Sequence, residues 1–442
     1  MPQPLKEVLT EKLAESLSLP MPVLTPRRVY GMTGLPGKAT AVVGMRRAGK
    51  TTFLHQLRGE RLAAGRPRTQ LPYVNFEDER LAGLEAGQLG FLLDEYARRV
   101  PEVQGGVTWC FDEIQVVPGW ERFVRRVLDA ERDEIIVTGS SAALLSREIA
   151  TALRGRAWEV PLYPFGFAEV LAHQGKVVPD DPGFLTAAAR AQIEHAFLGW
   201  LRAGGFPEAQ GLGDAARRQL LQDYVDVAML RDVVERHGVG NVPGLRWLVR
   251  HLLGNAAAPF SVEKFYAALK SQGVAIAKDT VHQMLGHLED CFLVRLVWME
   301  SSSERQRMVN PRKAYPVDTG LIQVFDRSGK SNLGHALETA VLIELERRRC
   351  AVTYVRTPHG HEVDFLARGP GDEIELIQVC ADASDPATAE RELRALHSAG
   401  EVHAGARKRL LTLTRDGAPT VVPQDVVAQP AYEWLLTPPD TD

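Results

Sequence analysis

The spacing of apolar and polar positions divides the chain into stretches of different type. Between residues 40 and 138, short apolar runs alternate with longer stretches in which apolar residues recur at helical spacing. The short runs are 40–44, 72–76, 107–112 and 134–138. Strands that alternate with helices are typical of a parallel sheet covered by helices. The pattern therefore predicts an α/β domain over residues 37–162.

The segments on either side of this domain have other patterns. An amphipathic helix is predicted over 5–17 and is followed by Pro20, Pro22 and Pro26, so residues 1–36 are interpreted as a lead-in segment. After Pro164 the chain is mostly helical, with breaks at 179–183 and 204–207. We expect a small helical lid over residues 163–240.

Residues 241–327 follow the element order of a winged helix-turn-helix. A helix begins after Ser261, a turn follows at 271–273, and a second helix covers 278–290. Extended runs at 292–299 and 313–317, separated by three serines, predict a β-hairpin. Two helices around a short turn and then a hairpin are the elements of a winged helix.

Residues 328–442 predict a second, smaller α/β domain. A strong helix covers 333–349 and extended runs follow at 352–356, 362–367 and 375–380. The prediction for the whole chain is thus an α/β protein with a lead-in, a parallel sheet covered by helices, a lid, a winged helix and a C-terminal α/β domain.

Composition narrows the class of protein. Hydrophobic residues make up 45% and charged residues 24% of the 442 residues, which is the balance of a globular protein. The four cysteines are far apart and show no metal-ligand spacing, and no run approaches the ~20 apolar residues of a spanning helix. We expect a cytoplasmic protein without a membrane partner. Because the net charge is −4, an anionic partner needs a local basic patch.

The sharpest local motif is a phosphate-binding loop. The segment from Gly44 to Thr51 fits G-x-x-x-x-G-K-[ST] between a strand and a helix. Such a loop turns its backbone N–H groups toward phosphates, its lysine reaches the β and γ phosphates, and its hydroxyl binds Mg²⁺. The expected cofactors are ATP and Mg²⁺. The expected contacts are Gly44, Arg46, Arg47, Ala48, Gly49, Lys50, Thr51 and Thr52.

Two acids end the apolar run at 107–111. In a nucleotide site, Asp112 would hold Mg²⁺ through water and Glu113 would orient or deprotonate the attacking water. Acids at strand ends are also common as solvated residues. The upstream loop favours the catalytic interpretation.

Further candidates follow the run at 134–138. Thr138 or Ser140 would contact the γ-phosphate or the attacking water, unless the segment is a turn that caps the next helix. Arg154 and Arg156 are candidates for an arginine finger that acts in trans on a neighbouring subunit, a role that is worth ~10³ to 10⁵ in rate. Solvated surface arginines explain the same pattern.

With these motifs the chain resembles a prokaryotic family of AAA-type P-loop ATPases that carry a C-terminal domain of the restriction-endonuclease-like superfamily. The resemblance rests on runs spread over most of the chain. They are 73–80, 112–115, 118–121, 138–141, 153–156, 204–208 and 318–321. It implies an ATPase core, a lid, a winged helix and a nuclease-like domain at 328–442.

The resemblance also implies a metal site in the C-terminal domain. Asp364 and Gln378 match the first positions of the D…(E/Q)-x-K motif, and Glu338 on the preceding helix could complete the acidic site. Cys380 stands where the lysine is expected, and a thiol supplies no fixed cation. We therefore expect a degenerate site and no nuclease activity.

A basic stripe marks the expected wing. Arg305, Arg307, Arg312 and Lys313 would neutralise DNA phosphates, unless the stripe is a solvated hairpin or faces the C-terminal domain. The function we expect is an Mg²⁺-dependent ATP hydrolase that remodels or translocates DNA as a homo-oligomer, a hexamer among the options. The alternative is a nucleotide-dependent switch that binds a protein or DNA without transport. An ATP-dependent nuclease is disfavoured by Cys380.

Overall fold

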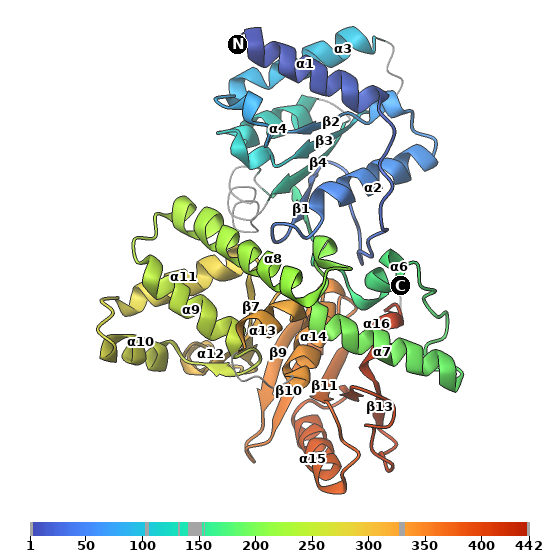
Figure 1. Ribbon diagram of the computed structural model, residues 1–442, viewed down its shortest axis with the longest axis vertical. Helices are drawn as coiled ribbons and strands as arrows, with labels where there is room; N and C mark the ends of the chain where they lie inside the picture. The colour runs from blue at the N-terminus through green and yellow to red at the C-terminus, as the bar shows by residue number, and fades with distance from the viewer. Residues whose placement is uncertain are drawn as a thin grey trace. The chain divides into compact units, whose positions relative to one another are not determined.

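The computed structural model describes residues 3–101, 106–130, 133–139, 153, 155–326 and 332–439. It consists of two compact units, a first unit of residues 1–162 and a second unit of residues 163–442. Of the expected site residues, Ser140 and Arg154 lie outside the described residues. Each unit is described by itself (Figure 1).

The first unit contains a five-stranded parallel sheet in the order β2-β3-β4-β1-β5. Each of the four predicted runs forms a strand, and β5 adds a fifth. Short 3₁₀ turns η1 to η4 cover 68–70, 79–81, 86–88 and 114–116. The helices and strands are α1 Gln3–Ser18, β1 Ala39–Val43, α2 Lys50–Ala63, β2 Tyr73–Asn75, α3 Gly90–Arg99, β3 Thr108–Asp112, α4 Trp120–Ala130, β4 Glu134–Gly139 and β5 Ala157–Pro161.

The alternation of side chains along β3 explains the layers of this unit. Cys110 faces a core formed with Phe53, Leu54 and Leu57 of α2. Its neighbour Phe111 faces the other way, and its ring lies 5.7 Å from that of Phe123 on α4. Because successive strand residues point to opposite faces, one buried strand supports helices on both sides. The predicted parallel sheet covered by helices is confirmed.

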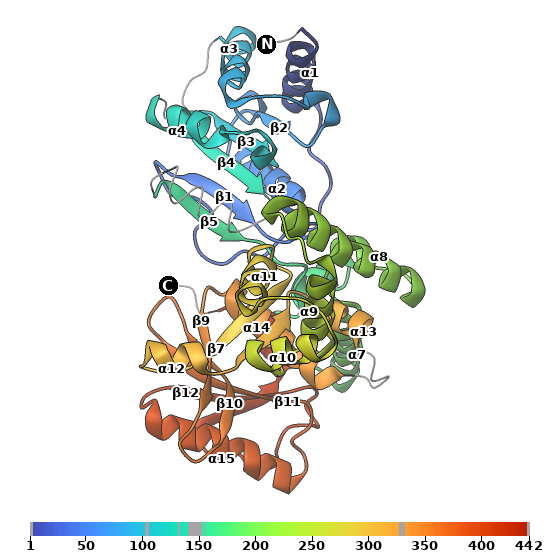
Figure 2. The same cartoon turned by 90° about the vertical axis from the view of Figure 1, so that its left-hand side faces the viewer.

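The N-terminal lead-in is part of this core. Leu9 and Leu13 of α1 are fully buried, and α1 lies beside α3 and β2 (Figure 2). Farther along, the guanidinium of Arg27 donates a 2.7 Å hydrogen bond to the carbonyl of Ala48 in the phosphate-binding loop. The first 36 residues therefore support the sheet and the loop.

The second unit contains an eight-stranded sheet in the order β13-β12-β11-β10-β9-β7-β8-β6. Its helices are α6 Phe167–His173, α7 Ala187–Ala203, α8 Asp214–Val227 continued by a π-helical segment η7 Ala228–Glu235, α9 Val242–Gly254, α10 Val262–Ser271, α11 Lys278–Asp290, α12 Glu304–Val309, α13 Thr319–Phe325, α14 Leu333–Arg347, α15 Pro386–Val402 and α16 Ala431–Leu436. A 3₁₀ turn, η6, covers Pro207–Ala209. The strands are β6 Pro259–Phe260, β7 Val294–Met299, β8 Arg312–Pro316, β9 Ala351–Arg356, β10 Glu362–Arg368, β11 Ile374–Cys380, β12 Arg407–Thr412 and β13 Val426–Pro430.

Strands from both sides of the expected boundary at residue 327 share this sheet. β7 and β8 form the predicted antiparallel pair, with the short helix α12 between them. β7 also pairs in parallel with β9, through Trp298 opposite Thr353 and Met299 opposite Tyr354. The hairpin of the expected wing is thus continuous with the C-terminal sheet (Figure 1).

The helices of the expected lid share a core with the C-terminal domain. Phe197 and Trp200 of α7 belong to the same buried cluster as Leu337 of α14 and Phe365 of β10. The other face of β10 and β11 packs on α15 through a separate cluster that contains Leu366 and Leu396. The segments 163–240 and 328–442 therefore contribute to one compact unit.

Two sequence runs that the resemblance singled out meet in this unit. The buried carboxylate of Asp318 accepts hydrogen bonds from the backbone N–H groups of Gly205, at 2.6 Å, and Gly320, at 2.9 Å. Gly204 has φ 79°, and a Cβ there would lie 1.9 Å from an Asp318 oxygen. Burial raises the pKa of Asp318 to about 6, although both hydrogen bonds oppose this shift. These glycines are needed for the close approach of the two segments.

Candidate nucleotide site

The phosphate-binding loop follows β1 and has a backbone that requires glycine at both ends. Gly44 has φ 156°, and a Cβ there would lie 2.1 Å from the carbonyl oxygen of Leu162. Gly49 has φ 97° and caps α2, which begins at Lys50. Residues other than glycine are strained at such positive φ angles. The loop therefore turns at the N-terminus of a helix, where backbone N–H groups favour anions.

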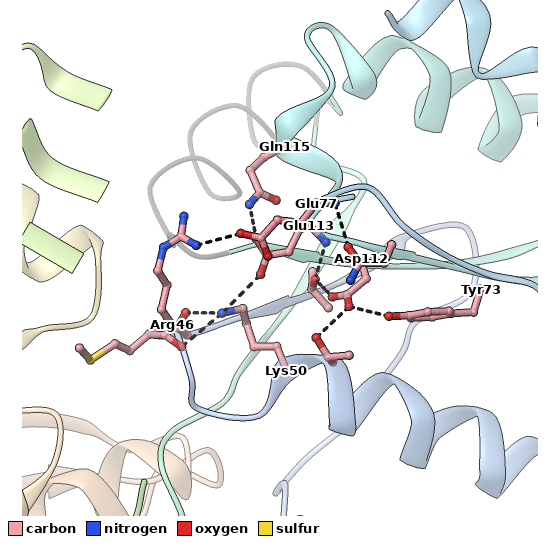
Figure 3. A network of polar contacts seen from close by, with 12 residues as sticks. Arg46, Lys50, Tyr73, Glu77, Asp112, Glu113 and Gln115 are labelled. Carbon is pink, nitrogen blue, oxygen red and sulfur yellow. Dashed lines mark hydrogen bonds and ion pairs between the residues drawn. The ribbon is translucent and has the colours of Figure 1, made fainter. Parts of the chain in front are cut away.

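Lys50 lies buried at this loop. Its Nζ donates to the carbonyl oxygens of Gly44, at 3.1 Å, and Met45, at 3.2 Å, and lies 3.9 Å from Glu113 Oε1 (Figure 3). The ammonium is therefore held between the loop and the end of β3. This position suits a lysine that binds the β and γ phosphates of a nucleotide.

Asp112 is fully buried at the end of β3 and accepts three side-chain hydrogen bonds. Its Oδ2 accepts from Thr51 Oγ1 and from the hydroxyl of Tyr73, both at 2.8 Å, and its Oδ1 accepts from Thr138 Oγ1 at 2.5 Å. Burial raises the pKa of Asp112, and these hydrogen bonds oppose the rise. A carboxylate that is fixed in this way has a defined orientation.

Glu113 leaves the strand in the left-handed conformation, with φ 52°. Its backbone N–H donates to Thr138 Oγ1 at 2.9 Å, and its carboxylate accepts a hydrogen bond from the amide of Gln115 (Figure 3). Left-handed backbone costs on the order of 1 kcal/mol or more in a residue other than glycine, and such residues gather at functional sites. Here the turn directs the carboxylate toward Lys50.

The structure brings together Lys50, Thr51, Asp112, Glu113 and Thr138 from three segments of the sequence. Thr138 is buried and its hydroxyl bridges the two acids, so in this arrangement it orients Asp112 and Glu113. The loop arginines lie nearer the surface, and Arg46 forms a 3.4 Å ion pair with Glu77.

Arg156 lies away from this site. It precedes β5, whose first residue Ala157 pairs with Ala39 at the start of β1, whereas the phosphate-binding loop follows the end of β1. Five residues of strand span about 16 Å. The exposed guanidinium pairs with Asp129. Arg156 therefore does not reach the nucleotide site of its own subunit, and its action in trans stays a prediction.

Three residues that sequence reasoning did not assign support the site. They are Arg27, which binds the loop at Ala48, Tyr73, which binds Asp112, and Gln115, which binds Glu113. The sequence did single out the run 73–80, which begins at Tyr73. Its contact with Asp112 depends on the pairing of β2 with β3, which the sequence did not specify.

The oxygen donors of this site fit Mg²⁺. A threonine hydroxyl and a carboxylate are the hard ligands that Mg²⁺ accepts, and the ion usually keeps several waters and takes further oxygens from phosphates. In the part of the chain that the structure describes, no group of three or more His, Cys, Asp or Glu side chains is placed to hold a metal ion. The hydroxyl of Thr51 and the carboxylate of Asp112, which are hydrogen-bonded to each other, are donors of the kind that Mg²⁺ accepts together with phosphate oxygens.

Comparisons with known proteins agree with this site. Residues 36–171 match the family model of an AAA domain, and residues 194–331 match a domain of unknown function, DUF8612. The uncharacterized protein MJ1544 of Methanocaldococcus jannaschii is 30% identical over 444 residues, which cover 98% of this chain and 96% of the relative. This chain belongs to the same family as MJ1544. Within this chain, residues 36–171 match an AAA-type P-loop domain, and this domain contains the parallel α/β sheet.

Other proteins are similar over a smaller share of the chain. An uncharacterized protein of Haemophilus influenzae is 30% identical over 76% of this chain and 81% of the relative. The Walker-type ATPase PABY2304 of Pyrococcus abyssi is 17% identical, covers 72% of this chain and 95% of its own, and has a TM-score of 0.38. The Aeropyrum pernix ORC1 protein in complex with DNA is 16% identical over 74% and 92%, with a TM-score of 0.26. Scores below 0.5 are too low to assign a fold or a function.

The expected nuclease residues form a second cluster, in the second unit. Glu338 and Asp364 face the ammonium of Lys313, which lies 3.2 Å from a Glu338 oxygen and 3.0 Å from oxygens of Asp364 and Glu362. Asp364 lies in a bulge of the β9–β10 pair, where a strand can redirect a side chain. Gln378 donates to Glu392 at 2.8 Å. The cluster thus contains a lysine that the strand motif lacks.

Lys313 corrects one expectation about the basic stripe. Only 3% of it is exposed, and it pairs with carboxylates in the protein interior, so it is not a surface contact for DNA. Burial lowers the pKa of Lys313, but the charges of Asp364, Glu338 and Glu362 outweigh this effect and raise it. Cys380, in contrast, donates to the Asp382 carbonyl.

Two of the other arginines of the stripe lie over one aromatic ring. The guanidinium of Arg312 lies 3.6 Å from the centre of the Trp298 ring, and that of Arg307 lies 5.7 Å from it. Arg305 is exposed on α12. This arrangement combines positive charge with an aromatic surface on the hairpin of β7 and β8.

Among the described residues, no helix is long and apolar enough to cross a membrane.

Proposed function

We propose that this protein binds Mg²⁺ and ATP at the first unit and hydrolyses ATP there. The observation that carries the proposal is the placement of Glu113 next to Lys50, with Asp112 fixed beside Thr51. Lys50 and the loop N–H groups would bind the β and γ phosphates. Mg²⁺, when bound, would neutralise charge on these phosphates.

Within this proposal the chain's own residues prepare the attacking water. Glu113 would accept a hydrogen bond or a proton from that water. The hydroxyl of Thr138 fixes the relative position of the two acids, because it accepts from the backbone N–H of Glu113 and donates to the carboxylate of Asp112. An arginine supplied by a neighbouring subunit, Arg156 or Arg154, would stabilise the charge of the transition state. Hydrolysis then depends on a homo-oligomer, and a hexamer is one option.

We further propose DNA as the partner of the second unit. The helices α10 and α11 with the hairpin of β7 and β8 would act as a winged helix, and Arg305, Arg307 and Arg312 would bind phosphates. The Trp298 ring beneath Arg312 supports this proposal, because an arginine that is held flat on an aromatic ring is preorganised. Hydrolysis would move this unit relative to DNA. A switch that binds a protein or DNA without transport is the alternative.

A second candidate function is cleavage of DNA, and Lys313 is the observation that favours it. The sequence argument against cleavage was that Cys380 supplies no cation. In the structure the Lys313 ammonium lies beside Asp364 and Glu338, where it could stabilise a phosphate or activate water. The same ion pairs also occupy the Lys313 ammonium with carboxylates of the protein. Our first proposal for this unit therefore remains a degenerate domain that binds DNA without cleaving it.

Steady-state ATP hydrolysis with and without DNA tests these proposals. The protein is assayed alone and with single-stranded, duplex and four-way-junction DNA at ~100 mM salt, since salt screens phosphate contacts. Stimulation by one DNA form supports the DNA-coupled machine. ATP binding with slow turnover that no DNA changes favours the switch. Mg²⁺-dependent cutting that Asp364→Asn abolishes supports the second candidate.

The salt dependence of DNA binding tests the basic surface. The double variant Arg305→Ala with Arg307→Ala should lower the slope of log K against log [salt] by about 2, since each duplex phosphate contact contributes about 0.9. Arg394→Ala is the matched control, because Arg394 is an exposed arginine on α15 that pairs with Glu390. An equal slope in the wild type and the double variant would place the contacts elsewhere.

A further inference from the structure

Tyr73 connects the neighbouring strand β2 to the acid at the end of β3. Its hydroxyl donates a 2.8 Å hydrogen bond to Asp112 Oδ2, the oxygen that also accepts from Thr51 (Figure 3). Its ring lies 4.6 Å from the ring of His55 and 5.4 Å from the guanidinium of Arg58. Both neighbours come from α2, so the ring is held between this helix and the sheet.

The hydrogen bonds to Asp112 leave little freedom to its carboxylate. An ionised carboxylate accepts about four hydrogen bonds. Three acceptor positions are taken by Thr51, Tyr73 and Thr138, on both oxygens. With Mg²⁺ bound, the remaining position would be available to accept a hydrogen bond from a metal-bound water. A carboxylate that lost the Tyr73 bond would keep only Thr51 on Oδ2 and could rotate away from that direction.

We propose that Tyr73 is a positioning residue for Mg²⁺, which holds Asp112 in the orientation that binds the ion with the nucleotide. This inference rests on the proposed ATPase function. Tyr73 contacts Asp112, so in this proposal it acts on the ion only through that carboxylate. Because the tyrosine ring is rigid and fixed by its packing, it provides a more constant donor than a mobile water would.

Tyr73→Phe separates positioning from packing, because it keeps the ring beside His55 and Arg58 and removes only the hydroxyl. The matched control is Tyr96→Phe. The Tyr96 hydroxyl also donates one partly buried hydrogen bond in the first unit, at 2.7 Å, but to the carbonyl of Thr69. Its ring lies 5.1 Å from Trp109. Each variant thus loses one hydrogen-bonding hydroxyl and keeps its aromatic ring.

Binding of a fluorescent ATP analogue to the full chain is measured in EDTA and across a Mg²⁺ titration. A Mn²⁺ titration followed by electron paramagnetic resonance, with ATP present, reads the ion directly. Tyr73→Phe should raise the half-saturating Mg²⁺ about ten-fold, the effect of losing one hydrogen bond to a charged group. Nucleotide affinity in EDTA and the urea midpoint should match those of Tyr96→Phe, and high Mg²⁺ should restore hydrolysis.

Three results would overturn the inference. One is a wild-type Mg²⁺ requirement in Tyr73→Phe. Another is a loss of nucleotide affinity in EDTA that equals the loss in Mg²⁺, since this would show a structural role. The third is a Mg²⁺ requirement that rises equally in Tyr96→Phe. Failure of the wild type to bind ATP in any condition would instead refute the proposed function.

Discussion

Replacement of Lys313 by methionine tests whether its charge stabilises the second unit. Methionine keeps the length of the buried stem and removes the ammonium. In the native structure this ammonium lies 3.0 to 3.2 Å from oxygens of Glu338, Glu362 and Asp364, and its side chain is 4% exposed. The hydroxyl of Tyr315 also donates to Glu338, at 2.6 Å. The variant therefore removes the cation that these three carboxylates share.

The expected loss of stability follows from this geometry. Removing one partner of a buried ion pair costs about 3–5 kcal/mol, because the remaining charge stays buried. Part of this cost is avoided when a carboxylate binds a proton. Burial and the charge of Asp364 raise the pKa of Glu338 to about 8 in the wild type. We expect a loss of about 3–5 kcal/mol at pH 8.5 and a loss about 1–2 kcal/mol smaller at pH 6.

The sign of the pH effect follows from proton binding. Burial and the charge of Asp364 raise the pKa of Glu338 in the folded state above the 4.5 of an unfolded glutamate, so between these two pKa values the folded state keeps a proton that the unfolded state has lost. The folded state thus binds more protons in this window, and the stability that Glu338 contributes is lost as the pH rises through it. Without the Lys313 ammonium the carboxylates bind protons more tightly, so the variant should lose more stability at high pH than the wild type.

Urea unfolding at both pH values, read by hydrogen exchange of peptides that cover β8 and β10, measures this loss in the second unit. The control is Lys278→Met, which removes the ammonium of an exposed pair with Glu263, where less than about 1 kcal/mol is expected. A loss in Lys313→Met that equals the control at both pH values would refute the reasoning. A loss that is larger at pH 6 would refute the assignment of the sign.

Further predictions concern the first unit. Glu113→Gln should keep ATP binding and lower turnover by ~10² or more, and unchanged turnover would remove Glu113 from the mechanism. Gly44→Ala should abolish ATP binding and lower the urea midpoint, because the new Cβ would lie 2.1 Å from the carbonyl oxygen of Leu162. The control is Gly59→Ala in α2, where a Cβ has no neighbouring atom within 4 Å, so this variant should be neutral or stabilising. Arg156→Ala should leave stability within about 1 kcal/mol and ATP binding unchanged but reduce hydrolysis. If the arginine acts in trans, addition of Glu113→Gln subunits, which keep Arg156, should restore part of the hydrolysis by Arg156→Ala. Absence of this rescue in verified mixed oligomers would argue against an arginine finger.

The residues of the nucleotide site could be predicted from the sequence because each belongs to a short contiguous motif. The loop from Gly44 to Thr51 and the pair Asp112–Glu113 are contiguous motifs, and parallel strands bring their ends to one edge of a sheet. The hydrophobic pattern also predicted four of the five strands of the first unit. Local spacing and strand periodicity carry this information without any knowledge of long-range contacts.

The contacts that complete each site were decided by the tertiary structure. Tyr73 reaches Asp112 because β2 pairs with β3, and Lys313 reaches Asp364 because β8 joins the sheet that contains β10 and shares its cluster with α14. In the sequence, Lys313 belongs to a basic stripe and Cys380 marks a missing lysine. The pairing of distant strands depends on the packing of the whole unit, which no local pattern specifies. The sequence therefore determined which chemistry is present at each motif, and the packing of distant strands and helices decided which side chains act together.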